Sequence, residues 1–496
     1  MKKEHIILAI IFLIVFGIRL SFAFQTPNFS SDEAYYNIRQ IDHIKNTFLP
    51  IIKDDLSYGG KILYLPPLFY YLMAGLSYIF KMGFAGKFFP NLFAASFVIV
   101  AYLISNQLTK NKSAKFLTVL MAGFMPLFFS ETINSMSIHS FALPLTFFTL
   151  YCMIRIINKE KRFIGYFIPS LLVLRMTTPN VVFLIFALLV YLVFIFLEKM
   201  ERTRAETELV LFSTFLIVWT LFVSFKKAFL EHGLAILWQN IPEQLLRNYF
   251  ANINLLTVIY FIGLIPFIFG LYAIYKYSFG EKDKKIYLLI SFAVVIASLM
   301  WLKLIELKLA LMFIGFIMIF LFAKSYEFVL TIIHNKKLRL AFTLSIFLLI
   351  LISSVVPSLV LASIKIKEAY SYEEISALEW LNRHTTKDDI ILSNLDEGHM
   401  IATISDRKNF IDSNFMFVEN IDQRLEDAYK MYKTPSQTQA ITLMNKYGIS
   451  YIYFSKRAKK NYGISEIAYA DENCFEREFG NKDVEIYKSL CIIEEK

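Results

Sequence analysis

The amino-acid sequence predicts a polytopic α-helical membrane protein with a small α/β domain at its C-terminal end. Of its 496 residues, 56% are hydrophobic and only 19% are Asp, Glu, Lys or Arg, too few charges for the surface of one soluble domain. Apolar runs long enough to cross a bilayer recur down to Leu361, and the composition then becomes ordinary and charged. We therefore predict a transmembrane domain over residues 1–363 and a soluble domain over residues 364–496.

The apolar runs predict about eleven membrane-spanning helices joined by short loops. They are expected at residues 6–24, 88–107, 116–129, 141–155, 163–174, 181–197, 209–223, 255–274, 286–300, 309–322 and 342–361. Lys2 and Lys3 precede the first run, so the positive-inside rule places the N-terminus in the cytoplasm and the C-terminal domain outside. The first run is long for a signal peptide and lacks a small-residue cleavage site, so we expect it to be retained.

Two external loops contain further apolar patterns. The first loop, residues 25–87, contains the aromatic stretch 65–72 behind a pair of prolines, which predicts a helix lying at the membrane interface. A full crossing there would put every later basic loop on the wrong side. In the loop 226–254, apolar residues at roughly helical spacing predict either a second surface helix or a short extension of a neighbouring span.

The C-terminal segment has the pattern of an α/β domain. A helix is expected over residues 373–384, buried strands over 389–393 and 449–454, and a helix ending at Gly448. Cys474 and Cys491 could pair there if the domain faces an oxidising compartment.

Several functional classes are excluded by composition and motifs. The net charge of +10 comes from Lys and Arg in the loops between apolar runs, where they set membrane topology, so no nucleic-acid partner is expected. The sequence also contains no P-loop, nucleophile elbow, paired Cys-x-x-Cys or His-Glu-x-x-His motif. The candidates for chemistry are charged residues at the external membrane face.

The first candidates are Asp32 and Glu33, directly after the first span. Either carboxylate could act as a general base toward an acceptor hydroxyl, or could bind a divalent cation, Mg²⁺ or Mn²⁺, that holds a phosphate. Arg39 lies within two turns of both acids if the stretch is helical. The alternative is a solvated loop whose acids face water.

Later external turns carry four more charged candidates. Glu131 and His139 could complete a metal or phosphate site, although helix capping by the neighbouring serines and a solvated histidine explain them equally simply. Arg175 and Lys308 stand near the ends of spans, where basic side chains either anchor a lipid phosphate or extend to the interface.

The order of these motifs resembles the glycosyltransferase-C class of membrane glycosyltransferases. Residues 33–39, Glu-Ala-Tyr-Tyr-Asn-Ile-Arg, are similar to the oligosaccharyltransferase pattern Asp-Pro-Tyr-Phe-Asn-Tyr-Arg, which places Glu33 on the essential acid. Asp32-Glu33 also resembles the Asp-Glu pair of protein mannosyltransferases and lipid A aminoarabinose transferases, which favours Asp32. Residues 380–399 resemble the segment that carries Trp-Trp-Asp-Tyr-Gly in oligosaccharyltransferases, with Asn394-Leu395 in place of the tryptophans and Glu397 in place of the tyrosine.

This resemblance implies a transferase acting on a lipid-linked sugar. It implies a polyprenyl-phosphate donor, a protein or glycolipid acceptor on the external face, and Asp32 or Glu33 as the base. It further implies a donor phosphate held by Arg39, Arg175 or Lys308, and an acceptor site near Asp396, Glu397 and His399. The changed tryptophan and tyrosine positions favour the broader class over oligosaccharyl transfer to asparagine, which stays the alternative, as does a non-catalytic or transport relative.

Overall fold

The computed structural model describes residues 2–63, 65–251, 253–471 and 473–493, and the chain divides into two compact units. The first, here the helical unit, comprises Met1–Pro27, Leu65–Phe225 and Tyr249–Lys367. The second, here the tail unit, comprises Asn28–Tyr64, Lys226–Asn248 and Glu368–Lys496. The part of the first loop that contains Asp32 and Glu33 therefore folds with the C-terminal segment.

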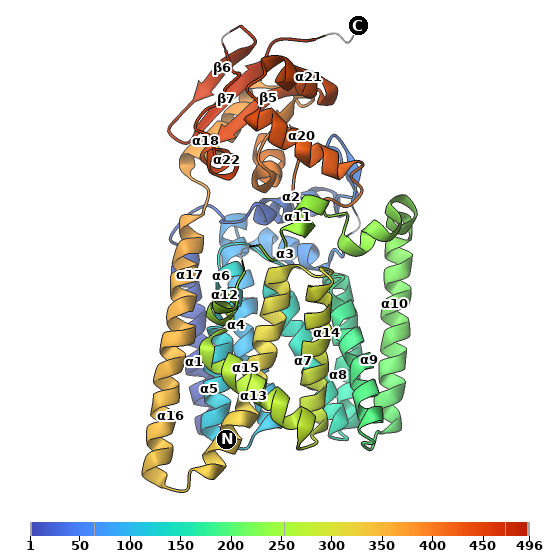
Figure 1. Cartoon of the computed structure of the whole chain (residues 1–496), viewed down its shortest axis with the longest axis vertical. Coiled ribbons are helices and arrows are strands. Elements are labelled where there is room, and N and C mark those ends of the chain that lie inside the picture. The colour runs from blue at the N-terminus through green and yellow to red at the C-terminus, as the bar shows by residue number, and fades with distance from the viewer. Residues whose placement is uncertain (1, 64, 252, 472, 494–496) are drawn as a thin grey trace. The chain divides into compact units, whose positions relative to one another are not determined.

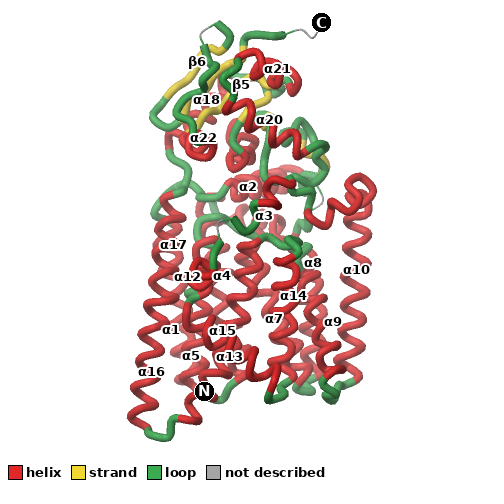
Figure 2. Tube along the Cα trace, viewed as in Figure 1, coloured by secondary structure: helices red, strands yellow, loops and turns green. Residues whose placement is uncertain are grey.

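The helical unit is a bundle of apolar helices, shown in Figures 1 and 2. Its helices are α1 (Lys2–Ala23), α3 (Leu68–Ile79), α4 (Met82–Leu108), α5 (Lys112–Gly123), α6 (Pro126–Glu131), α7 (His139–Ile157), α8 (Ile164–Thr177), α9 (Val181–Leu197), α10 (Arg204–His232, whose last residues belong to the tail unit), α12 (Leu255–Ile262), α13 (Leu264–Phe279), α14 (Lys284–Trp301), α15 (Leu307–Ile332), α16 (Lys336–Ile350) and α17 (Val356–Lys367).

The apolar runs expected to span the membrane are largely helical, with breaks at residues 124–125 and at Gly263, and the count of eleven spans is not confirmed. In the described residues eight helices are long and apolar enough to cross a bilayer, or nine if α12 and α13, which meet at a bend of 102°, form one span. Helices α8 and α9 are shorter, with 14 and 17 residues. Helix α3 has 12 residues and rises about 18 Å, too short to cross about 30 Å of hydrocarbon, as expected for an interfacial helix.

Buried aromatic side chains fill the centre of the bundle. Phe97 of α4 stacks on Phe316 of α15 with ring centroids 3.8 Å apart, and Phe147 of α7 packs edge-on against the same ring. Apolar side chains also face outward on α10, where Phe215, Trp219 and Phe222 are exposed. This distribution fits a helix that contacts lipid on one side and protein on the other.

The tail unit is built on a five-stranded mixed sheet with the order β4-β3-β5-β7-β6. Strand β3 is parallel to β4 and β5, whereas β7 is antiparallel to β5 and β6. The strands are β3 (Ile390–Leu392), β4 (Lys408–Asn409), β5 (Ile449–Ser455), β6 (Phe475–Gly480) and β7 (Val484–Ser489). Both strands that the sequence predicted are therefore present, at the centre of the sheet.

Helices cover this sheet and connect its strands. They are α18 (Tyr372–His384), α20 (Ile421–Lys433), α21 (Gln437–Tyr447) and α22 (Lys456–Tyr462). A capping box of Ser371 and Glu374 begins α18, and Gly448, with φ of +64°, ends α21 in the left-handed conformation that glycine adopts without strain. Cys474 and Cys491, a possible pair in the sequence, form a disulfide.

The first-loop part of the tail unit consists of α2 (Asp32–Thr47) and a small hairpin of β1 (Lys53–Asp54) and β2 (Lys61–Ile62). Of the two alternatives for the loop 226–254, the structure has an extension of the neighbouring span, since α10 continues to His232, and no single helix covers the rest of the loop where the structure describes it. The structure has a 3₁₀ helix, Gly233–Trp238, and the short α11, Glu243–Arg247. Ile241 and Leu245 pack on the core of the tail unit, so part of the apolar pattern arises from contacts within the protein.

Candidate active site

The two early acids both lie in the first turn of α2, but they face different environments. Asp32 is buried and Glu33 is exposed. Successive side chains on a helix diverge by about 100°, so adjacent carboxylates cannot point into the same space. Of the two, Glu33 is the acid that solvent or a substrate can reach.

Asp32 connects α2 by hydrogen bonds to the segment that follows β3. Its Oδ2 accepts the backbone N–H of His399 at 3.0 Å, and its Oδ1 accepts that of Met400 at 2.7 Å. The hydroxyl of Thr403 donates to the backbone oxygen of Tyr35 at 2.9 Å. Asp32 thus caps the helical turn that begins at Gly398, where a side chain larger than hydrogen would collide with the backbone oxygen of Ile411.

Burial raises the pKa of Asp32 to about 8. The two backbone N–H donors oppose this rise, and the negative charges of Asp412 and Asp396 add to it. The carboxylate of Asp396 therefore acts electrostatically on Asp32.

We expect the stability of the tail unit to fall with rising pH through Asp32. The pKa of this group is about 8 when folded, against about 3.9 for an ordinary Asp, so its contribution is complete below about pH 4 and is lost as pH rises through 8. In Asp32→Asn the melting temperature should decline less between pH 6 and 8 than in the wild type, as measured by thermal unfolding in detergent. An unchanged decline would exclude Asp32 as its source.

A buried ionic cluster around Asp412 lies beside the capped turn. The Asp412 carboxylate accepts hydrogen bonds from Lys61 Nζ at 3.2 Å, Asn409 Nδ2 at 3.1 Å, the Asn414 amide at 2.9 Å and the Ser57 hydroxyl. Burial opposes ionisation of Asp412, but the Lys61 ammonium and these donors outweigh it and hold its pKa well below the usual range. Asp412 is therefore an ionised hub that joins the first loop to the tail segment.

Backbone contacts strengthen the same connection. Ser57 forms a parallel β-bridge with Asn409 of β4, whose N–H donates to the Leu56 oxygen at 2.8 Å. The Asn409 side chain accepts the N–H of Tyr58 at 3.1 Å, and Arg424 donates to the Tyr58 oxygen at 3.1 Å. The first loop thus extends the edge of the sheet, near the carboxyl ends of its parallel strands, where α/β folds commonly build their sites.

Two residues that the sequence analysis selected as candidate site residues have partners inside this cluster. Arg39 forms an ion pair with Asp54, and both side chains are largely buried. The ring of His399 packs on Tyr36 with centroids 5.0 Å apart, and burial lowers the pKa of His399 to about 4. His399 is therefore neutral at physiological pH and contributes packing beneath α2.

The three residues expected near the acceptor do not converge on one pocket. Asp396 is exposed, Glu397 is fully buried and His399 lies in the cluster just described. Burial raises the pKa of Glu397 to about 8, although the Ser455 hydroxyl opposes this rise. The Glu397 carboxyl group is therefore largely protonated near neutral pH. Only Asp396 presents a charge at the surface.

A second polar cluster lies in the helical unit. Glu131, at the end of α6, contacts Lys308 Nζ of α15 at 2.8 Å and Lys365 Nζ of α17 at 3.8 Å. His139, the first residue of α7, lies within electrostatic range of Glu131. The sequence analysis did not select Lys365, because this residue follows the last predicted span. A lysine directly after an apolar run could have indicated it as a candidate. The side chain of Lys308 is 49% exposed, so a ligand can approach it.

Arg175 serves another purpose in the structure. Its guanidinium donates to the Thr220 hydroxyl at 3.3 Å, the Thr220 backbone oxygen at 3.1 Å and the Ser224 hydroxyl at 2.7 Å. These bonds join α8 to α10. Lys308 is accordingly the better exposed of these two candidates for the donor phosphate.

Sequence reasoning also missed Arg19, a fully buried cation in α1. It donates to Asn91 Oδ1 at 3.0 Å and to the Thr132 hydroxyl at 2.6 Å, and its guanidinium lies 4.8 Å from the Phe129 ring centroid. An arginine within the first apolar run was the available signal. Arg19 ties α1 and α4 to the turn that follows Glu131.

The donor set for a metal ion is incomplete. Within residues 2–63, 65–251, 253–471 and 473–493, no three His, Cys, Asp or Glu side chains gather as they would around a cation. The predicted Mg²⁺ or Mn²⁺ site is therefore not formed by these residues, and we derive no step through a metal.

Comparison with solved structures identifies the fold as that of membrane glycosyltransferases of the glycosyltransferase-C class, which confirms the predicted fold class. The oligosaccharyltransferase AglB of Archaeoglobus fulgidus, tethered to an acceptor peptide with the sequon NVT, matches with a TM-score of 0.68 and 14% identity, over 93% of this chain and 70% of that one. ArnT of Cupriavidus metallidurans, bound to undecaprenyl phosphate, matches with a TM-score of 0.56 and 11% identity, over 98% of both chains.

A third match is the mycobacterial arabinofuranosyltransferase AftD, with a TM-score of 0.60 and 13% identity, over 97% of this chain and 40% of that one. The archaeal enzyme has also been crystallised with Zn and sulfate, and solved with an inhibitory peptide and a dolichol-phosphate. No protein-family model matches the sequence. No curated protein matches it either.

Proposed function

We propose that this protein is an integral-membrane glycosyltransferase that moves a sugar from a polyprenyl-phosphate-linked donor to an acceptor on the extracytoplasmic face. The observation that carries the proposal is the presentation of Glu33. Its neighbour Asp32 is buried as a cap. Glu33, which the sequence resemblance places on the essential acid of oligosaccharyltransferases, is exposed in the first turn of α2. The fold shared with enzymes solved with lipid phosphates supports the same donor class.

In this proposal Glu33 is the general base. It takes the proton of the acceptor hydroxyl or amide as that group attacks the anomeric carbon of the donor sugar. The bond from the anomeric carbon to the phosphate oxygen breaks, and the electron pair leaves with the lipid-linked phosphate. The negative charge that develops on this phosphate is stabilised by a fixed cation, for which Lys308 is the candidate and Lys365 an added one.

We expect Lys308→Met to weaken use of the lipid donor. A charge-assisted hydrogen bond contributes about 1.5–3 kcal/mol, so KM for a polyprenyl-phosphate sugar should rise about 10- to 100-fold in proteoliposomes. Lys81→Met removes an exposed lysine at the start of α4 and should leave KM unchanged. Equal donor kinetics in both variants would remove Lys308 from the phosphate site.

Oligosaccharyl transfer to protein asparagine is the second candidate, favoured by the match to the peptide-bound archaeal enzyme. Transfer to a glycolipid, or to another protein residue, is the alternative acceptor class. The test is reconstitution with lipid-linked sugar and acceptor peptides with and without an Asn-x-Thr sequon. Transfer to the sequon peptide alone assigns the asparagine acceptor, and the same reactions with added Mg²⁺, Mn²⁺ or chelator test a cation requirement. No transfer from any lipid-linked donor would overturn the proposed function.

We further propose that the N-terminus is cytoplasmic and that the C-terminal segment lies outside. The disulfide Cys474–Cys491 supports an oxidising compartment for that segment. A membrane-impermeant thiol reagent should label these cysteines in reduced, intact cells. Labelling only after the membrane is opened would place the segment on the cytoplasmic side.

A further inference from the structure

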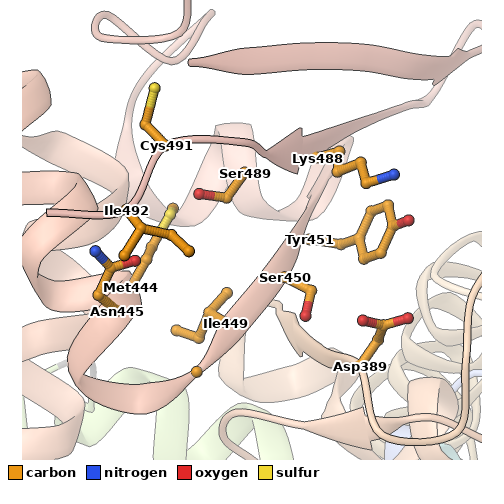
Figure 3. Close-up of a pocket in the computed structure, with 11 residues that line it drawn as sticks. Asp389, Met444, Asn445, Ile449, Ser450, Tyr451, Lys488, Ser489, Cys491 and Ile492 are labelled. Carbon is orange, nitrogen blue, oxygen red and sulfur yellow. The ribbon is translucent and has the colours of Figure 1, made fainter.

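A cavity of about 450 Å³ lies at one end of the sheet in the tail unit, as Figure 3 shows. It is formed where β3 and β5 begin and β7 ends, together with the last turn of α21. Its volume falls within the range of about 300–1,000 Å³ that is typical of small-ligand sites. Because β3 and β5 begin here, the cavity lies at the opposite end of these strands from the turn capped by Asp32.

The charged groups of this cavity already have partners. Asp389 Oδ2 accepts the N–H of Thr386 at 2.7 Å and its hydroxyl at 2.9 Å. Lys488 Nζ pairs with Glu478 Oε1 at 3.1 Å. An ionic ligand would have to compete with these interactions, so the cavity favours a neutral one.

Neutral polar residues also line the cavity. The amide nitrogen of Asn445 is buried and lacks a hydrogen-bond partner. The hydroxyls of Ser450 and Ser489 make no side-chain hydrogen bond with any part of the chain that the structure describes. A buried amide without an acceptor is unusual in a folded protein and is satisfied when a ligand supplies one. Met444, Ile449 and Ile492 add apolar surface between these groups.

The position of the cavity disfavours an extended peptide as its occupant. A peptide strand pairs with the exposed edge of a sheet, which here means β6, because the first loop already pairs with β4. The cavity instead lies across the ends of the central strands β3, β5 and β7. Its wall is held by the disulfide, since Cys491 lines the cavity and the Leu490 N–H donates to the Cys474 oxygen at 2.9 Å. It is suited to a compact ligand that enters end-on.

We propose that this cavity binds one neutral saccharide unit of a glycan. Hydroxyl and amide groups beside a small apolar surface match a ligand that has many hydroxyl groups and no charge. The site is separate from Glu33, so the inference goes beyond the proposed transfer and stands or falls without it.

The test is saturation-transfer NMR on the full chain in detergent with glucose, galactose, mannose and N-acetylglucosamine as probes. At least one sugar should bind, and the double substitution Asn445→Leu with Ser450→Ala should weaken its binding tenfold or more. Thr442→Ala, on the exposed side of the same helix, should leave binding unchanged. Glu33→Gln should also bind normally, which separates this site from the proposed catalytic one.

A second arm uses the same sugar on a polyprenyl diphosphate in nanodiscs. Binding there that the double substitution weakens assigns the site to donor glycans, and binding of the free sugar alone assigns it to acceptor or product glycans. The inference is overturned if none of the sugars binds, or if the double substitution leaves binding unchanged.

Discussion

Replacing Glu33 with glutamine is expected to lower kcat for sugar transfer about 10²–10⁴-fold, the usual contribution of a positioned general base. Glutamine keeps the shape of the side chain but cannot accept the proton of the acceptor. Because Glu33 is exposed, the change should leave thermal stability almost unaltered. The measurement is transfer from a fluorescent lipid-linked sugar in proteoliposomes, with the melting temperature recorded on the same sample.

Two variants serve as controls for Glu33. Asp55→Asn removes an exposed first-loop acid and should leave transfer unchanged. Asp32→Asn should reduce stability along with activity, because the amide can accept only one of the two N–H bonds at the capped turn. A large loss of activity at unchanged stability in Asp32→Asn, with normal transfer in Glu33→Gln, would transfer the role of base to Asp32.

Replacing Asp412 with alanine is expected to lower the free energy of unfolding of the tail unit by about 3–5 kcal/mol, the range found when one partner of a buried ion pair is removed. The Lys61 side chain is 1% exposed and would remain charged or lose its proton in an apolar setting. Hydrogen bonds from Ser57, Asn409 and Asn414 would be lost as well. The loss of unfolding free energy is measured by denaturant unfolding of the full chain in detergent, with hydrogen exchange of the tail unit as the readout.

The exposed pair Lys53–Asp55 in the same loop provides a matched control. Asp55→Ala should change the free energy of unfolding by less than about 1 kcal/mol, since ion pairs in solvent contribute little. The double variant Lys61→Met with Asp412→Leu should recover much of the loss, because it leaves no unpaired charge buried. Equal effects of Asp412→Ala and Asp55→Ala would show that the cluster does not hold the loop.

The helical segments were predictable because a bilayer imposes a simple rule on sequence. The apolar runs, from residues 6–24 to residues 342–361, are formed by helices, with a break inside two of these runs, since only helices satisfy their own backbone in hydrocarbon. The span count was less secure, because α8 and α9 are short and α12 meets α13 at a sharp bend. Periodicity alone does not determine how far a helix extends.

The sequence indicated Asp32 and Glu33 as candidates, but it did not indicate how they connect to the rest of the chain. The motif around Glu33 is local, so the sequence could place it at the end of the first span. The partners of Asp32 and Lys61 lie more than 300 residues away in the chain, and no local pattern predicts that His399, Met400 and Asp412 contact them. The apolar pattern of the loop 226–254 has the same cause, since Ile241 and Leu245 pack on the core of the tail unit.

The hydrogen bond between Asp32 and His399 affects the order in which the protein folds during synthesis. Asp32 and its partner are 367 residues apart, so the helix bearing Glu33 acquires its anchor only after almost the whole polypeptide has left the ribosome. A truncated or stalled product would carry Glu33 without the hydrogen bonds that anchor its helix. Under the proposed function, an unfinished chain would lack an oriented Glu33 and should transfer no sugar.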